Sequence, residues 1–279
     1  MMAPATLLVP LDGSTNAAAA LSVARGLAHP MDATVVLIHV GREALASHEL
    51  PGRMGLSAED VRGLVIDQCA GSPAPAIVRE AVARHAVLIV MCTSAWPDGP
   101  LHAFGSVLDE VLLNAPCPVV LVPSIPSRGP WVLRQLVLPH DGTPTSGAAI
   151  APTADLASRA GAELVVLHIA TPSDERPAES GTFVMPRYLD QPQHEWPSWS
   201  REFLERVRGL CYPANIENIR LVLVHGEASS AILEFARRNA SDLIALAWRG
   251  SLEAERAQTI RRVIRDASCP VIVFRVQAR

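Results

Sequence analysis

The chain repeats itself, and the repeat limits its possible folds more than any other feature. The segment VPLDGS at 9–14 returns as LPHDGT at 138–143, 129 residues later, and APCPV at 115–119 returns as ASCPV at 267–271, 152 residues later. Intermediate matches are 155 residues apart, so the second copy carries 26 extra residues before Gly226 and lacks three after Ala247. A chain of 279 residues is therefore predicted to contain two related domains of ordinary size.

Each copy alternates short apolar runs with stretches of helical periodicity, which is typical of parallel strands joined by crossover helices. In the first copy, the pattern predicts strands at 6–10, 34–40, 64–69, 87–92 and 119–122, and helices at 16–27, 73–84 and 105–114. In the second copy, it predicts strands at 135–139, 163–169, 221–225, 243–247 and 271–274, and a helix at 197–210. The fold class is predicted to be α/β.

The repeat also divides the chain. We expect a first domain at 1–123, a linker at 124–130 rich in Pro, Gly and Ser, and a second domain at 131–279. The second domain contains an inserted loop and helix at about 171–210. The insertion includes Trp196 and Trp199, whose rings either pack on the domain or form an exposed interaction surface.

Composition excludes several functions. The formal net charge of −4 gives no broad positive field, so nucleic acid is not an expected partner. No run of about 18 uncharged apolar residues is present and the first residues lack a basic leader pattern, so we expect a cytoplasmic protein with no membrane association.

Lysine is absent: all 24 basic residues are arginine, which excludes a P-loop lysine, a Schiff-base lysine and a kinase-type ATP lysine. The five cysteines are scattered and form no CxxC pair, so reduced thiols are expected. No hydrolase triad or metal cluster is evident. We therefore expect no enzyme, with any ATP hydrolysis slow and incidental.

The order and spacing of several motifs in both copies resemble the universal stress protein family. The motifs are VPLDGS at 9–14, the strand LIVM at 88–91, Gly105-Ser106-Val107 at a helix start, and APCPV at 115–119. The resemblance covers essentially the whole chain, twice. It implies two open five-stranded parallel sheets of order 3-2-1-4-5 with helices on both faces, the adenine nucleotide alpha hydrolase-like fold. It also implies a stress-response function and, in many members, ATP bound at the carboxyl ends of the strands.

The nucleotide site implied by the resemblance falls in the first copy. The family pattern is Gly, two residues, Gly, nine residues, then Gly-Ser or Gly-Thr, and the matching positions here are Cys92, Ala95 and Gly105-Ser106. The spacing is kept, but both leading glycines are replaced, which brings a Cβ to places where backbone would approach phosphate. The full set of expected ligand-binding residues is Pro10, Asp12, Val40, Cys92, Ala95, Gly105, Ser106 and Val107.

The second copy departs further from this pattern. Ala247 and Gly250 hold the first two glycine positions, but Ala257-Gln258 stands where Gly-Ser should be. Asp141 remains at the position that matches Asp12. We expect a degenerate site and a structural role for this copy.

Several candidate residues also have simpler interpretations. Asp12, Asp141 and Gly105-Ser106 could be ordinary turn and helix-capping residues. His39 and His168, at the ends of the second strands, are expected to be buried, hydrogen-bonded histidines rather than ligands. Cys92 is interpreted as a small apolar replacement for glycine; a redox role would require a lowered pKa.

Two functional hypotheses remain. The first is a regulatory switch that binds ATP or another adenine nucleotide, possibly with Mg²⁺, in the first copy. The second is a nucleotide-free adaptor for a protein partner that the sequence does not identify. In either case the apolar last strands at 119–122 and 271–274 should pair with each other, because unpaired edges promote association. The chain would then be an internal pseudo-dimer that can form a homodimer.

Overall fold

The structure is a computed structural model, and it describes residues 5–14, 17–43, 45–93, 106–123, 129–170, 182, 192–211, 218–249 and 255–276. The chain forms two compact units, one of Met1–Val132 with Ile264–Arg275 and one of Leu133–Val263 with Val276–Arg279. The second unit therefore begins just after the predicted linker, and the last strand of the chain belongs to the first unit.

The first unit is an open α/β sheet with the predicted strand order. Its strands lie in the order β3-β2-β1-β4-β5, followed by β10, and all neighbours are parallel except β5 and β10, which are antiparallel. The elements in chain order are β1 (Ala5–Pro10), α1 (Ala17–Met31), β2 (Ala33–Gly41), α2 (Leu50–Arg53), β3 (Val65–Ala70), α3 (Pro73–Ala83), β4 (Ala86–Cys92), α4 (Ser106–Asn114), β5 (Val119–Val122) and β10 (Val271–Arg275).

The second unit repeats this order with the strands β9-β6-β7-β8, all parallel. Its elements are β6 (Gln135–His140), α5 (Pro144–Gly147), α6 (Ile150–Ala160), β7 (Glu163–Ala170), α7 (Pro192–Cys211), β8 (Ile219–His225), α8 (Ala228–Arg238), β9 (Leu243–Trp248) and α9 (Glu255–Asp266). The division between the units falls within α9. The sequence pattern predicted α7 but began it five residues late, and it did not predict α5, α6, α8 or α9.

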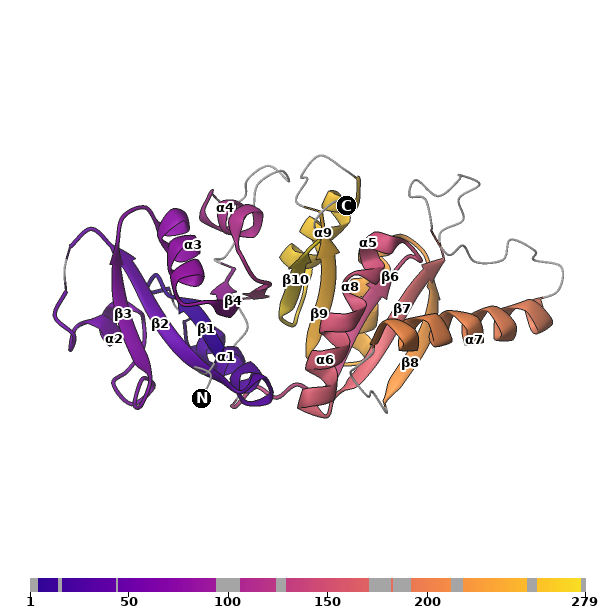
Figure 1. Cartoon of the computed structure of the whole chain (residues 1–279), viewed down its shortest axis with the longest axis horizontal. Coiled ribbons are helices and arrows are strands. Elements are labelled where there is room, and N and C mark those ends of the chain that lie inside the picture. Colours follow the sequence, from indigo (N-terminus) through magenta and orange to yellow (C-terminus); the bar gives the residue numbers. More distant parts are fainter. Residues whose placement is uncertain are drawn as a thin grey trace. The chain divides into compact units, whose positions relative to one another are not determined.

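The central strands form the core because they are apolar on both faces. Leu7, Leu8 and Val9 of β1 have no exposed surface, and neither have Leu136 and Val137 of β6. Leu8 lies between Val36 of β2 and Ile89 of β4. Helices cover both faces of such a sheet, because right-handed crossovers change face where the strand order reverses. In the first unit α1 packs on β1, β2 and β4, while α3 packs against α4 (Figure 1).

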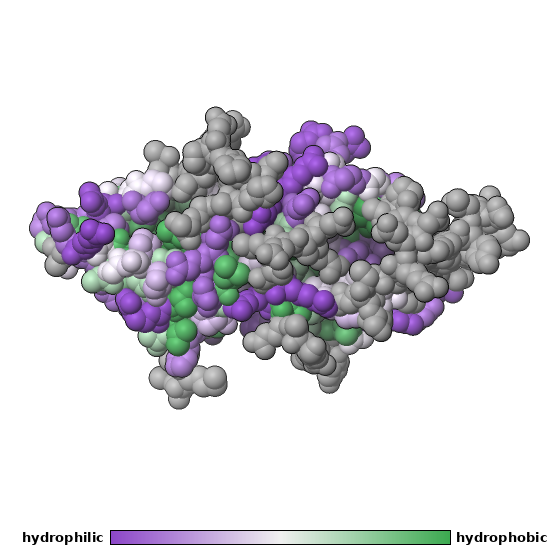
Figure 2. Space-filling model, turned by 90° about the horizontal axis from the view of Figure 1, so that it is seen from above, coloured by the Kyte–Doolittle hydropathy of each residue, from purple (hydrophilic) through white to green (hydrophobic). Residues whose placement is uncertain are grey.

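Large apolar side chains that stay exposed do not gather on one element. Those in the described part of the chain are Val65 of β3, Val82 of α3, Val132 and Leu210 of α7. Figure 2 shows small hydrophobic areas separated by hydrophilic ones on the face that it draws. Scattered exposed residues of this kind are ordinary in folded proteins.

The end of the predicted linker is fixed to α1. The Ser22 hydroxyl donates to the Gly129 carbonyl at 3.3 Å, and Trp131 N–H donates to the Ser22 hydroxyl at 3.0 Å. A Cβ added at Gly26 would lie 2.5 Å from the Trp131 ring. Glycine at this helix position therefore lets the chain at Trp131, just after the predicted linker, cross α1 at close range.

Candidate functional site

The strand order brings several of the predicted site residues to one edge of the first sheet. Because β1 lies between β2 and β4, the carboxyl ends of these strands, near Pro10, Val40 and Cys92, are neighbours. We call this region the carboxyl edge of the first repeat. The strand order reverses between β1 and β4, which is where open α/β sheets bind ligands.

Asp12 lies in the exposed loop that follows β1. Its Oδ1 accepts a hydrogen bond of 2.9 Å from Ser14 N–H, which closes a small turn. Among the described residues, Ser14 is the one hydrogen-bond donor to this carboxylate. The turn orients Asp12 and leaves Oδ2 without a protein donor in that part of the chain.

The segment around α2 packs directly against this turn. Gly13 has a φ of +87°, and a Cβ there would overlap the Arg53 carbonyl oxygen. Gly55 has a φ of +75°, and a Cβ there would lie 2.9 Å from the Ser14 carbonyl oxygen. Met54, which directly precedes Gly55, is fully buried. Both glycines are needed for conformation and for space.

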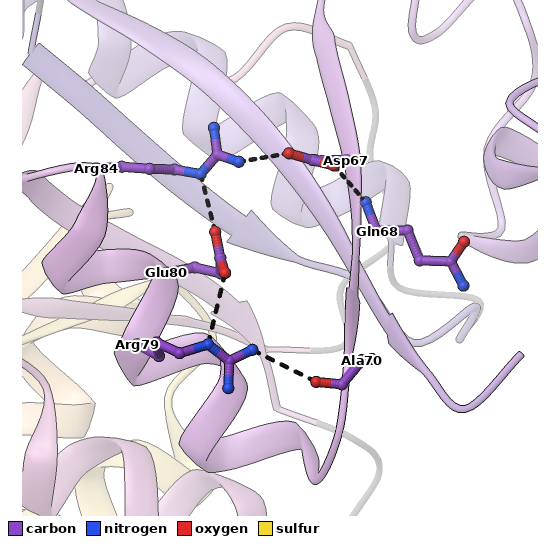
Figure 3. Close-up of polar contacts among 6 residues, drawn as sticks. All are labelled: Asp67, Gln68, Ala70, Arg79, Glu80 and Arg84. Carbon is purple, nitrogen blue, oxygen red and sulfur yellow. Dashed lines mark hydrogen bonds and ion pairs between the residues drawn. The ribbon is translucent and has the colours of Figure 1, made fainter. Parts of the chain in front are cut away.

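Gln68 of β3 holds the chain that follows β2. Its Nε2 donates to the Glu43 carbonyl, and its Oε1 accepts from Leu45 N–H at 2.9 Å. A group of ion pairs and hydrogen bonds, drawn in Figure 3, fixes β3, the strand that carries Gln68. Arg84, which directly follows α3, contacts Asp67 of β3 at 2.5 Å and Glu80 of α3 at 3.3 Å. β3 and the end of α3 are thus joined, and Gln68 holds Glu43 and Leu45, which follow β2.

Cys92 is the last residue of β4, and its side chain is half-buried. Burial raises the pKa of its thiol to about 12, a hydrogen bond with the Ala20 backbone opposes this, and the Asp12 carboxylate raises it further. The thiol is therefore protonated at neutral pH and lacks the thiolate that redox chemistry needs. This supports the interpretation of Cys92 as a replacement for glycine. The strand order also places Cys69 of β3 three strands from Cys92 of β4, as expected.

The remaining predicted residues are only partly within the described structure. Ala95 and Gly105 lie outside the described residues. Ser106 begins α4, and Val107, the next residue, is half-buried. Asp109 lies in the first turn of the same helix.

The second repeat uses its aspartate differently. Asp141 Oδ1 accepts from Thr143 N at 3.1 Å, from the Thr143 hydroxyl at 2.6 Å and from the Ser146 hydroxyl at 2.7 Å. Thr143 in turn caps α5 by accepting from Ser146 N. Gly142 N–H donates to His140 Nδ1 at 2.8 Å. Asp141 is thus bound within its own turn beside the Thr143 cap, which agrees with its simpler interpretation as a turn residue.

An aromatic side chain covers the strand ends of this repeat. Phe203 of α7 is buried, with its ring centroid 5.1 Å from that of His140 and 5.6 Å from that of His168. His168 Nδ1 lies 2.9 Å from the His140 carbonyl oxygen, and burial lowers the pKa of His168. Trp248, at the end of β9, is also buried. Large side chains therefore occupy the strand ends in the second repeat.

The histidine in the first repeat is also structural. His39 is buried, and its Nδ1 lies 3.2 Å from the Leu11 carbonyl oxygen. The expectation of hydrogen-bonded core histidines at 39 and 168 is confirmed. Within the described ranges, no group of three or more His, Cys, Asp or Glu side chains is placed to hold a metal ion.

Sequence reasoning missed Gln68, Gly55 and Phe203. The pairing of Gly13 with Gly55 carried a usable signal, because isolated glycines often mark close backbone approaches. Gln68 and Phe203 carried none, because their partners lie far away in the sequence.

In the part of the chain that the structure describes, no helix has both the length and the apolar character needed to cross a membrane.

These features define a duplicated open α/β protein whose candidate site lies at the strand-order reversal of its first repeat. The model of the Universal stress protein family matches residues 5–123 and, a second time, residues 133–275. The chain therefore belongs to the universal stress protein family, as a tandem member with two such domains.

Individual relatives agree with this assignment. A universal stress protein of Methanocaldococcus jannaschii is 26% identical over 157 residues, covering 54% of this chain and 88% of its own. A crystal structure of a universal stress protein from Archaeoglobus fulgidus matches with a TM-score of 0.62 at 18% identity, covering 97% of this chain and 98% of its own. A functionally unknown protein from Pseudomonas aeruginosa matches with a TM-score of 0.61, also at 18% identity, covering 98% and 93%. These two structures share the fold.

Proposed function

We propose that the first repeat binds an adenine-containing ligand at its carboxyl edge and that the protein acts as a ligand-responsive regulatory module. The second repeat supports the first structurally. The observation that carries this proposal is the contrast between Asp12 and Asp141. Asp12 receives one hydrogen bond within the described structure and keeps Oδ2 for a ligand, whereas Asp141 Oδ1 accepts three donors of its own turn.

The chemistry of such a contact is simple. A carboxylate accepts hydrogen bonds only, so Asp12 suits a ligand that presents donors, such as ribose hydroxyls or the adenine amino group. The turn that closes on Ser14 N–H fixes the direction of the carboxylate before a ligand arrives, which reduces the entropy cost of binding.

The alternative function is a nucleotide-free adaptor, and two observations favour it. The α2 segment lies tightly against the Asp12 turn, since the Arg53 carbonyl oxygen leaves no room for a side chain at Gly13. A half-buried thiol also stands where the family motif has its first glycine. In this alternative, the fold is kept for contacts with a protein partner.

Calorimetric titration separates the two functions. Adenosine, AMP, ADP and ATP, with and without Mg²⁺, are titrated into the full chain and into Asp12→Ala and Asp141→Ala variants, with circular dichroism to verify folding. One-site binding that is lost in Asp12→Ala and kept in Asp141→Ala is the expected result. Absence of heat with every compound would contradict the proposal and favour the adaptor.

A further inference from the structure

Equivalent hydrogen bonds hold the ends of the first two strands in both repeats. In the first repeat His39 Nδ1 lies 3.2 Å from the Leu11 carbonyl oxygen, and in the second His168 Nδ1 lies 2.9 Å from the His140 carbonyl oxygen. The two histidines that use Nδ1 are 129 residues apart, and so are the two residues whose carbonyl oxygens they contact. The carboxyl ends of these strands are therefore held in the same way in both copies.

The second repeat places an aromatic ring against these strand ends. The ring centroid of Phe203 lies 5.1 Å from that of His140, with the two rings edge to face, and 5.6 Å from that of His168. His140 and His168 are direct neighbours in the pairing of β6 with β7. Phe203 is 2% exposed. The phenyl ring is thus enclosed, and it makes aromatic contacts with the ends of both strands.

This ring lies at the positions that correspond to the candidate site of the first repeat. Asp12 and Val40, two of the expected ligand-binding residues, lie just after β1 and near the end of β2. Their counterparts 129 residues later are Asp141 and Ile169, which directly follow the two histidines in contact with Phe203. The side chain of α7 therefore packs where the repeat would place a ligand.

The first repeat has no such ring in the equivalent connection. Residues 42–64, which join β2 to β3, contain no Phe, Tyr or Trp, and the Asp12 turn beside them is exposed. Residues 171–218, which join β7 to β8, include α7 and with it Phe203. The two copies thus differ at one place: a side chain of the protein covers the strand ends in the second repeat, and the equivalent turn faces solvent in the first.

We propose that Phe203 is an internal occupant of a ring-binding site in the second repeat, and that this site takes a planar aromatic ring, such as a purine base, when the phenyl ring is removed. The proposal goes beyond the proposed function, and only the choice of a purine rests on that function. Enclosed apolar spaces left by a removed side chain bind small aromatic molecules. The second repeat keeps a structural role because its ring site is filled by its own chain.

The test removes the ring from the full chain with Phe203→Ala and uses adenine as the probe. We expect the variant to unfold about 10 °C below the parent protein, because a buried phenyl ring is lost. Calorimetric titration should show one more equivalent of bound adenine than in the parent. Saturating adenine should raise the unfolding temperature of the variant by about 5 °C, because it binds the folded state alone. Ribose, which has no aromatic ring, should do neither.

Val207→Ala is the matched control. Val207 lies one turn further along α7 and is 2% exposed, as Phe203 is. Its truncation should lower the unfolding temperature without adding an equivalent of adenine. Phe203→Val is a milder second variant that also removes the ring, and it should gain the same additional equivalent. If either Phe203 variant unfolds on its own, refolding in the presence of adenine should restore its circular dichroism.

The outcomes separate this inference from the proposed function. If the Phe203 variants fold and bind no more adenine than the parent, or unfold and are not restored by adenine, the ring-site inference is wrong, whatever the parent binds. If the parent binds no adenine compound while the variants bind one equivalent of adenine, the proposed function of the first repeat fails and the ring site of the second repeat stands.

Discussion

Thr153 lies in α6 with no exposed surface, and its hydroxyl has no hydrogen-bond partner among the described residues. The matching position in the first repeat is Ala24, which is equally buried. A buried hydroxyl without a partner costs free energy, because it gives up its hydrogen bonds to water. The second repeat therefore carries a local instability that the first repeat avoids.

Thr153→Val should stabilise the protein. The substitution keeps the size and branching of the side chain and removes the unpaired hydroxyl, so we expect a gain of about 1 kcal/mol in the free energy of unfolding. Urea unfolding measures the change. Thr153→Ser keeps the hydroxyl and should bring no gain; equal stabilisation by serine would contradict this explanation.

At the scale of elements, a helix cap distinguishes the two repeats. Glu227 precedes α8, and its carboxylate accepts from Ser229 N and Ser230 N, each at 2.9 Å. The corresponding cap of α3, Ser72, makes no such side-chain bond. Partial burial of Glu227 opposes ionisation, but hydrogen bonds from Ser229 and Ser230 outweigh it and lower the pKa of Glu227 to about 2.

This cap predicts a pH dependence of stability. Because the folded pKa of Glu227 lies below its unfolded value, its contribution is present at neutral pH and is lost as the pH falls from about 4.5 toward 2. Glu227→Gln should cost about 1 kcal/mol at pH 7 and progressively less in acid. Urea unfolding between pH 3 and 7 measures this; a loss that stays constant with pH would exclude the carboxylate as its cause.

The connections between the second and third strands also act at the scale of elements. In the first repeat the connection carries α2, which packs by backbone contact on the Asp12 turn. In the second repeat it carries α7, which places Phe203 against two histidines. The same connection therefore shapes a candidate site in one copy and covers the strand ends in the other.

At the scale of the whole molecule, the last strand of the second repeat completes the first unit. β10 pairs antiparallel with β5 through Ile272 and Val120, and it belongs to the same compact unit as β1 to β5. The pairing predicted for the two apolar last strands is observed. It covers an edge that would otherwise be free to associate.

Because β10 pairs with β5, a substitution in β10 near the end of the chain should destabilise the first repeat. Ile272→Pro removes a backbone donor from the β10 ladder and should expose the β5 amides at Val119–Val122 to rapid hydrogen exchange. Ile272→Val is the control and should cost no more than about 1 kcal/mol. If the β5 amides keep the same protection in the proline variant, the pairing of β10 with β5 does not stabilise the first unit.

The sequence by itself determined the duplication, the class of the fold and the position of nearly every strand. The strands could be predicted because a buried parallel strand needs only a short apolar run between turn residues, as at Leu7 to Val9. The strand order followed from the resemblance that those motifs carried. Helices α6 and α8 were missed although their apolar residues recur at helical spacing at least as clearly as those of α1 and α3, which were predicted.

The tertiary structure decided what the repeated residues do. Asp12 and Asp141 occur in nearly identical segments. Only the folded chain shows that Thr143 and Ser146 bind Asp141, while Asp12 receives a single donor among the residues that the structure describes. Phe203 over His140 and β10 beside β5 likewise depend on residues far apart in the sequence. Local patterns determine elements because neighbouring residues form them, whereas a site forms from distant residues that only folding brings together.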